Sequence, residues 1–240
     1  MNFIGCNGRM AAFNYLDKLS RGIPFTHTRA CHLLYGLVAM FPHPKVVEVA
    51  CGYGKATLYL TAAAKLRNGC VRCVDFYEQV WEGKSAKDLL RQACLLDVCQ
   101  VTYGQDARWY LIELLSLHPD RWIDFAYVDA THTVEVDSFL ALALWTHMRP
   151  GGILALDDLD WTAATHAPDA TEITAPTISH VRKIFDYISK LPDVDDRCEW
   201  GGNEVEWNWG FLRKGSDSTA NSRPIGGLIQ SLDNNFPACL

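Results

Sequence analysis

The sequence predicts an α/β protein with a doubly wound, mostly parallel sheet. Short apolar segments, rich in β-branched residues, alternate with helical segments between residues 46 and 156. A glycine turn follows the first of these strands, and acidic residues follow the fourth and the fifth. Strands that are separated by helices imply right-handed crossovers and a sheet covered on both faces. The carboxyl ends of parallel strands open on one crevice, so a binding site is expected there.

Each element has its own signal in the chain. Apolar residues at helical spacing predict helices over residues 12–19, 28–40, 55–66, 84–96, 107–117, 134–147 and 178–191. Short β-branched or apolar runs predict strands over residues 46–50, 71–75, 101–103, 125–129, 153–156, 196–200 and 206–213. The last two strands are joined through Gly201-Gly202-Asn203, a sequence typical of an antiparallel pair. The sheet should therefore have seven strands, with an antiparallel strand near the C-terminus.

The pattern along the chain indicates one domain over residues 1–214. Residues 1–44 form an N-terminal helical cap, and residues 45–160 carry the alternating core. Residues 161–177 are rich in Ala, Thr, Pro and Asp without periodicity, which is typical of a functional loop that contacts substrate. Residues 215–240 begin with a polar stretch rich in Gly, Ser and Asn, so we expect a flexible C-terminal tail.

Composition narrows the class of protein. The chain has 240 residues, of which 49% are hydrophobic and 21% are charged, enough for a large buried core. Its formal net charge is -6 and no stretch concentrates Lys or Arg, so nucleic acid and membrane surfaces are not expected as partners. The nine cysteines, without a secretory signal, read as reduced thiols, and Cys70 and Cys73 read as strand residues rather than zinc ligands. We expect a cytoplasmic protein.

The glycine turn, Glu48-Val49-Ala50-Cys51-Gly52-Tyr53-Gly54, carries the first chemical inference. Gly52 and Gly54 lack Cβ, so the backbone can bend sharply and approach a ligand closely. The amides at the start of the next helix, near Thr57, would point at an anionic group. Asp75 ends the second strand, where an acid can accept hydrogen bonds from ribose hydroxyls. A nucleotide-like cofactor fits these features, while a plain βα turn with Asp75 as a cap or surface charge is the alternative.

This stretch resembles the first motif of the class I S-adenosylmethionine-dependent methyltransferases, acid-x-Gly-x-Gly-x-Gly, with Ala50 in place of the first glycine. Thr57 occupies the third glycine position of a dehydrogenase motif, which disfavours hydride transfer. The resemblance implies a Rossmann-like fold and S-adenosylmethionine as the cofactor. The cofactor-binding positions that it implies are Glu48, Ala50, Gly52, Tyr53, Gly54, Thr57, Asp75, Phe76, Gln105, Asp106 and Asp129.

The second half of the core adds an acidic motif. Asp129-Ala130-Thr131-His132 follows the fourth strand, and Asp157-Asp158 follows the fifth. This pattern resembles the methyltransferase group that includes macrolide-sugar O-methyltransferases and cephalosporin-hydroxylase-like proteins, and also the catechol and caffeoyl-coenzyme A O-methyltransferases. The resemblance implies that Asp129, Asp157 and Asp158 hold a divalent metal, for which oxygen ligands favour Mg²⁺. It implies catalytic roles for Asp129 and for His132, an imidazole suited to accept a proton at neutral pH.

These residues together predict a Mg²⁺-dependent O-methyltransferase that acts on a small hydroxylated molecule, such as a phenol or a natural-product or sugar hydroxyl. Two other functions stay open: a metal-independent N- or O-methyltransferase, and a non-catalytic relative that only binds the cofactor. In these, Asp157 and Asp158 would cap a loop and His132 would bond to the backbone near a helix start. Trp161 in the long loop is a candidate substrate contact. The sequence leaves the acceptor open, and also whether the protein forms a homo-oligomer.

Overall fold

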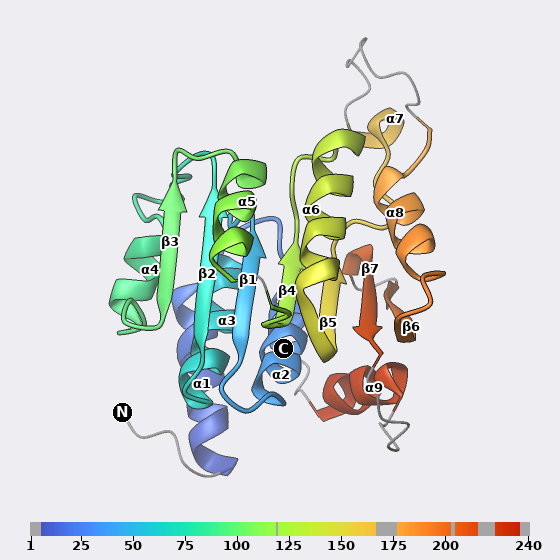
Figure 1. The fold of residues 1–240 in the computed structure, drawn as a ribbon. Helices are drawn as coiled ribbons and strands as arrows, with labels where there is room; N and C mark the ends of the chain where they lie inside the picture. The colour runs from blue at the N-terminus through green and yellow to red at the C-terminus, as the bar shows by residue number, and fades with distance from the viewer. Residues whose placement is uncertain (1–5, 119, 167–176, 203–204, 216–223, 236–240) are drawn as a thin grey trace. The chain divides into compact units, whose positions relative to one another are not determined.

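The computed structural model describes residues 6–118, 120–166, 177–202, 205–215 and 224–235. The chain forms two compact units (Figure 1). Unit 1 comprises Met1–Asp106 and Ser231–Leu240, and unit 2 comprises Ala107–Gln230. Among the described residues, no helix combines the length and the apolar character that crossing a membrane requires.

Unit 1 alternates helices and strands. Its elements are α1 (Cys6–Leu19), α2 (Thr28–Ala39), β1 (Lys45–Val49), α3 (Lys55–Leu66), β2 (Cys70–Asp75), α4 (Ala86–Gln92) and β3 (Cys99–Tyr103). The three strands are parallel, with β2 between β1 and β3, and Val49 is in register with Val74. Residues 46–49 are all buried, as expected for a strand covered on both faces. Asn68, with a φ of 54°, and Gly69 follow α3 and lead directly into β2.

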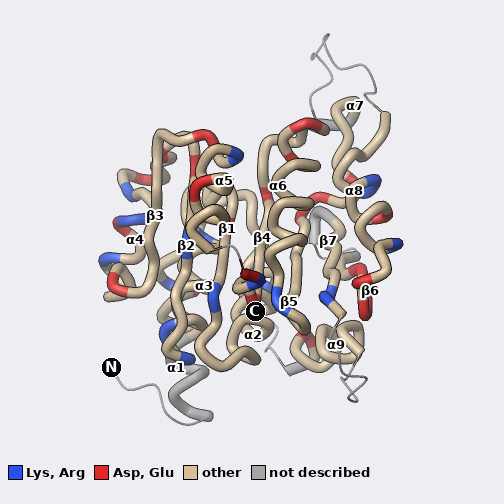
Figure 2. The backbone as a smooth tube through the Cα atoms, in the orientation of Figure 1, with Lys and Arg blue, Asp and Glu red and all other residues tan. Residues whose placement is uncertain are grey.

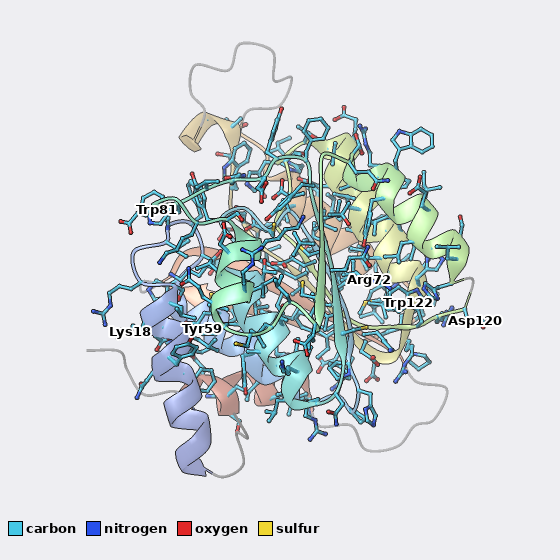
Figure 3. The ribbon with its side chains drawn as sticks, turned by 90° about the vertical axis from the view of Figure 1, so that its left-hand side faces the viewer. Lys18, Tyr59, Arg72, Trp81, Asp120 and Trp122 are labelled. Carbon is cyan, nitrogen blue, oxygen red and sulfur yellow. The ribbon has the colours of Figure 1, made fainter. Side chains whose placement is uncertain are left out.

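A polar network joins the helices of unit 1. His32 of α2 and Tyr59 of α3 both bond to the carboxylate of Asp17 in α1, at 2.8 Å in the case of His32 Nε2. Ser20 lies 3.2 Å from the same Tyr59 hydroxyl. Figure 3 shows Tyr59 beside α1. Because His32 and Tyr59 are buried, these bonds satisfy polar groups that would otherwise cost free energy inside the core.

Unit 2 continues the alternation and then changes it. Its elements are α5 (Ala107–Leu117), β4 (Ile123–Val128), α6 (Val134–His147), β5 (Met148–Leu156), α7 (Ala163–His166), α8 (His180–Ile188), β6 (Val194–Gly202) and β7 (Val205–Lys214). β4 and β5 are parallel, and β7 is antiparallel to both β5 and β6. Helix α9 (Ile225–Asn235) has residues in both units.

The strand order along the sheet is β3-β2-β1-β4-β5-β7-β6. The prediction of a Rossmann-like, mostly parallel seven-stranded sheet with an antiparallel strand near the C-terminus is confirmed. The helices at residues 55–66, 107–117 and 134–147 also have the predicted bounds. The β6–β7 pair confirms the predicted antiparallel connection, although Asn203 lies outside the described residues.

Several element ends are shifted, most of all at α1, which begins at Cys6, and at β5, which begins at Met148. Three further segments differ from the prediction. Helix α4 is shorter than residues 84–96, because Ser85 and Asp88 form a capping box that fixes its start and Cys94 adopts a positive φ of 57° after its end. The expected substrate loop contains helix α7, and its residues 167–176 lie outside the described part. Residues 225–235 of the expected flexible tail form α9, where Ile225 and Ile229 are buried; the polar stretch before them concealed this apolar spacing. Residues 216–223 and 236–240 of that tail lie outside the described part.

Candidate active site

The glycine turn of unit 1 follows the end of β1. Ala50, Gly52 and Gly54 have φ angles of 63°, 51° and 85°, all in the left-handed region. A Cβ on Gly54 would lie 2.4 Å from the Cβ of Ala86, so only glycine lets α4 approach this closely. A Cβ on Gly52 would meet nothing within 4 Å. Ala50 stands where the methyltransferase motif has its first glycine, and it adopts the left-handed conformation although it carries a Cβ.

Asp75 buttresses this turn. Its Oδ2 accepts a hydrogen bond from the backbone N–H of Gly52 at 2.9 Å, and its Oδ1 accepts one from the N–H of Tyr77 at 3.1 Å. The side chain is largely buried. Each carboxylate oxygen can accept a further bond, so the expected contact with ribose hydroxyls stays a prediction. The structure adds a second task, which is to hold the glycine turn against the end of β2.

The other predicted cofactor residues of unit 1 lie on β1 or after the carboxyl ends of its strands. Glu48 and Thr57 are fully buried, and no described group bonds to the Thr57 hydroxyl. Phe76 is 53% exposed, and its carbonyl accepts a bond from Gly104 at 3.1 Å, which places the Gln105-Asp106 segment next to the end of β2. Tyr53 stacks on Phe25 with ring centroids 5.6 Å apart.

The acidic residues of unit 2 lie together. Val128 and Leu156 are in register on parallel β4 and β5, so Asp129 and Asp157 leave the sheet side by side. We call Asp129, His132, Asp157 and Asp158 the acidic cluster. In Figure 2 the chain is coloured for Asp and Glu where β4 ends and where α6 begins. The structure thus brings together the three predicted metal-binding carboxylates and the predicted base.

Tyr127 links two of these carboxylates. Its hydroxyl lies 2.9 Å from Oδ2 of Asp157 and 3.2 Å from Oδ2 of Asp129. Its ring stacks on Trp209 of β7 at 5.2 Å, and both side chains are buried. A phenol has one proton to donate, so it cannot donate to two ionised carboxylates at once. The motif analysis missed this residue, although Tyr127 lies on β4 two positions before Asp129, the spacing at which side chains of an extended chain point to the same side.

His132 pairs with the other carboxylate. Its Nε2 lies 3.1 Å from Oδ2 of Asp158, and its ring stacks on Trp161 with centroids 4.6 Å apart. Both His132 and Asp158 have positive φ angles, 56° and 59°. Such a conformation is strained for a residue with a side chain, and it persists only where the surroundings hold it. No described group bonds to Nδ1 of His132 or to Oδ1 of Asp158, although both atoms are buried.

Burial and mutual repulsion set the pKa values of the carboxyl groups in the acidic cluster. Burial raises the pKa of Asp129 to about 7, and the charge of Asp158 adds to this effect. Burial also raises the pKa of Asp157 well above its usual range, with help from Asp129 and Asp158. Burial lowers the pKa of His132, but its hydrogen bond to Asp158 and the nearby negative charges outweigh this and raise it. Asp129, His132 and Asp158 each offer a ligand atom, all within 4.8 Å of one another. A divalent cation fits this set of donors, in which His132 takes the place that the prediction gives to Asp157.

Residues 47–159 match a family model described as a methyltransferase domain. The chain contains a methyltransferase domain. This methyltransferase domain includes both the glycine turn and the acidic cluster. No curated protein matches the chain in sequence.

Several solved structures share the fold of this chain. The O-methyltransferase TomG from Streptomyces achromogenes, involved in tomaymycin synthesis and solved with SAM, is 15% identical with a TM-score of 0.64 over 85% of this chain and 90% of that one. An O-methyltransferase from Bacillus cereus, solved with SAH, is 16% identical with a TM-score of 0.63 over 85% and 91%. SAH-bound PaMTH1 from Podospora anserina is 12% identical with a TM-score of 0.56 over 90% and 99%. At these identities the likeness shows the fold of the methyltransferase domain.

Proposed function

We propose that this protein transfers the methyl group of S-adenosylmethionine to a hydroxyl of a small molecule, with Mg²⁺ held by Asp129, Asp157 and Asp158. The observation that carries the proposal is the acidic cluster at the adjacent ends of β4 and β5 in a methyltransferase domain. The cofactor follows from the glycine turn with Asp75, and TomG and the Bacillus cereus enzyme were solved with SAM and SAH.

The donor set supports a cation at this position. Burial raises the pKa values of Asp129 and Asp157, and no described group bonds to Oδ1 of Asp158, so a bound cation would favour the ionised form of these carboxylates. A bound Mg²⁺ would lower the pKa of a coordinated hydroxyl and hold it in place. Oxygen ligands suit Mg²⁺.

His132 is the proposed base. If its Nε2–H donates to Oδ2 of Asp158, the neutral ring keeps a lone pair on Nδ1, and Asp158 would stabilise the imidazolium that forms. With S-adenosylmethionine bound, the acceptor oxygen would bond to the methyl carbon while the carbon–sulfur bond broke with its electrons going to sulfur, and Nδ1 of His132 would take up the hydroxyl proton. The products would be the methyl ether and S-adenosylhomocysteine, with the proton held on the imidazolium of His132. Most of the remaining task of the protein is to align the two reactants and exclude water.

The experiment uses a panel of phenolic and sugar acceptors and measures formation of S-adenosylhomocysteine with Mg²⁺ and with EDTA. We expect turnover that EDTA abolishes and Mg²⁺ restores, and near-complete loss in Asp157→Ala. Asp120→Ala, which removes an exposed aspartate of the same unit (Figure 3), is the matched control and should keep activity. Turnover that is indifferent to EDTA would favour a metal-independent methyltransferase.

Calorimetric titration with S-adenosylmethionine tests the cofactor separately. Binding without turnover on any acceptor would indicate a non-catalytic relative. Absence of binding would overturn the proposed function.

A further inference from the structure

Behind the acidic cluster lies a second group of metal-ligating side chains, His132, Asp137 and His180. One ligand atom from each lies within 4.8 Å of those of the other two. Asp137 and His180 are buried, and His132 is half-buried. Neither Asp137 nor His180 takes part in the proposed Mg²⁺ site, and neither was a candidate from the sequence.

Three separate elements supply these residues. His132 lies in the turn after β4, Asp137 in the first turns of α6, and His180 is the first residue of α8. Figure 1 shows α6 and α8 side by side. Nε2 of His180 lies 2.8 Å from Oδ2 of Asp137, and the backbone N–H of Thr131 donates to Oδ1 of Asp137 at 3.2 Å. The carboxylate is thus oriented by a backbone bond on one oxygen, as ligating carboxylates in metal sites commonly are.

The surroundings are those of an enclosed site. The Trp161 ring stacks on His132 and meets His180 edge-on at 6.0 Å, and therefore contacts both imidazoles. A cavity of about 10 Å³, close to the room that one water molecule needs, is lined by His132 and Asp137 of this group and by Asp129 and Asp157 of the acidic cluster, while His180 is not among its lining residues. Since Nε2 of His132 faces Asp158 and Nδ1 has no partner among the described residues, this imidazole has unused bonding capacity.

We propose that His132, Asp137 and His180 bind a zinc-class divalent ion. Two imidazole nitrogens and one carboxylate oxygen are a donor set that zinc uses with a fourth position left for water. Imidazole also favours first-row transition metals over Mg²⁺, which prefers oxygen ligands. This site therefore differs in selectivity from the all-carboxylate one that the proposed function requires. Because His132 is also the proposed base, a zinc ion bound to it would compete with that role.

The test is calorimetric titration of the purified protein with Zn²⁺, and the visible absorption of Co²⁺ as a probe of imidazole ligation. His180→Ala and Asp137→Asn should each weaken Zn²⁺ binding by about tenfold or more and reduce the Co²⁺ absorption. His180→Gln is the safer variant for folding, because its amide can still donate to Asp137 but is a poor zinc ligand. Thermal melts confirm that each variant is folded.

Two controls separate this proposal from simpler explanations. His118→Ala removes an exposed imidazole of the same unit and should leave Zn²⁺ binding unchanged. Asp157→Asn removes a ligand of the proposed Mg²⁺ site only, so it should weaken Mg²⁺ binding while Zn²⁺ binding stays. Folded His180→Gln that binds Zn²⁺ as tightly as the wild type would overturn the zinc site and leave the proposed function standing. A result in which only Mg²⁺ binding is lost would leave the proposed zinc site standing.

Discussion

The hydroxyl of Tyr127 lies 2.9 Å from Oδ2 of Asp157, and the same oxygen atom of Tyr127 reaches Asp129 at 3.2 Å. One phenolic proton therefore faces two carboxyl groups, and either a shared proton or a cation must relieve their repulsion. Tyr127 would thus act as a positioning residue that fixes the spacing of two proposed metal ligands.

Tyr127→Phe tests this relationship. The ring and its stacking on Trp209 are kept, while the hydrogen bonds to the carboxylates are lost, each worth about 1.5–3 kcal/mol when the partner is charged. We expect the Mg²⁺ affinity, measured by calorimetry, to fall by about tenfold or more, because the lost hydrogen-bond energy corresponds to a factor of this size in the dissociation constant. Tyr187→Phe, at an exposed tyrosine of α8, should change nothing. Unchanged Mg²⁺ affinity in Tyr127→Phe would show that the hydroxyl does not position the ligands.

The pKa of Asp129 gives the metal-free protein a defined pH dependence. Burial raises this pKa from 3.8 to about 7, so the folded state holds the proton more tightly than the unfolded state does. The resulting stability is fully present below about pH 4 and is lost as the pH rises through 7. Urea unfolding in EDTA should show a free energy of unfolding that falls over this range, and Asp129→Asn should flatten the fall. A slope that Asp129→Asn leaves intact would assign the effect to other groups.

The contact between Gly54 and Ala86 predicts a large effect of a single methyl group. In Gly54→Ala the new Cβ meets the Cβ and Cα of Ala86 at 2.4 and 2.5 Å in a residue with a φ of 85°. Gly83→Ala has a similar φ of 76° but no atom within 4 Å, so it isolates the backbone strain of about 1–2 kcal/mol. Gly54→Ala should lose a further 1–3 kcal/mol or so from overpacking. Equal losses of stability in Gly54→Ala and Gly83→Ala, measured by thermal or urea unfolding, would mean that α4 moves away from residue 54 without cost.

Lys214 of unit 2 is a buried lysine, and we expect its removal to cost less stability than the removal of its partner Asp193. Nζ of Lys214 lies 2.6 Å from Oδ2 of Asp193 and donates to the carbonyl of Trp145 at 3.0 Å, and the lysine side chain is 1% exposed. Asp193→Ala leaves the ammonium buried without its anion and should cost about 3 kcal/mol or more. Lys214→Met removes the charge itself, and Asp193, which is 39% exposed, can still be hydrated, so the cost should be smaller. Urea unfolding ranks the two, and the reverse order would contradict this account.

Acid should weaken the same pair. Burial acts to raise the pKa of Asp193, but the bonds from Lys214 and Trp145 outweigh it and lower the pKa below 3.8. The stability from Asp193 is therefore present above about pH 4 and lost as the pH falls through the lowered value. The stability of Lys214→Met should therefore depend less on pH in this range than that of the wild type. Circular dichroism at low pH can measure the difference.

The alternation of helices and strands could be read from the chain because periodicity is a local property. Residues 55–66 and 134–147 have the predicted bounds. The apolar runs before Asp129 and before Asp157 were enough to place both acids after neighbouring strands. The prediction missed α7, which is only a short turn of helix, and α9, whose apolar spacing follows a polar stretch that concealed it.

By itself, then, the sequence determined the fold class, the methyltransferase resemblance, and which acids could meet at the ends of β4 and β5. Only the tertiary structure decided the pairings within that group: Tyr127 between Asp129 and Asp157, His132 on Asp158, and Asp137 with His180. Asp137 and His180 are 43 positions apart, and no local pattern encodes their contact. It arises because the packing of α6 against α8 sets which side chains meet, and that packing depends on buried residues throughout the unit.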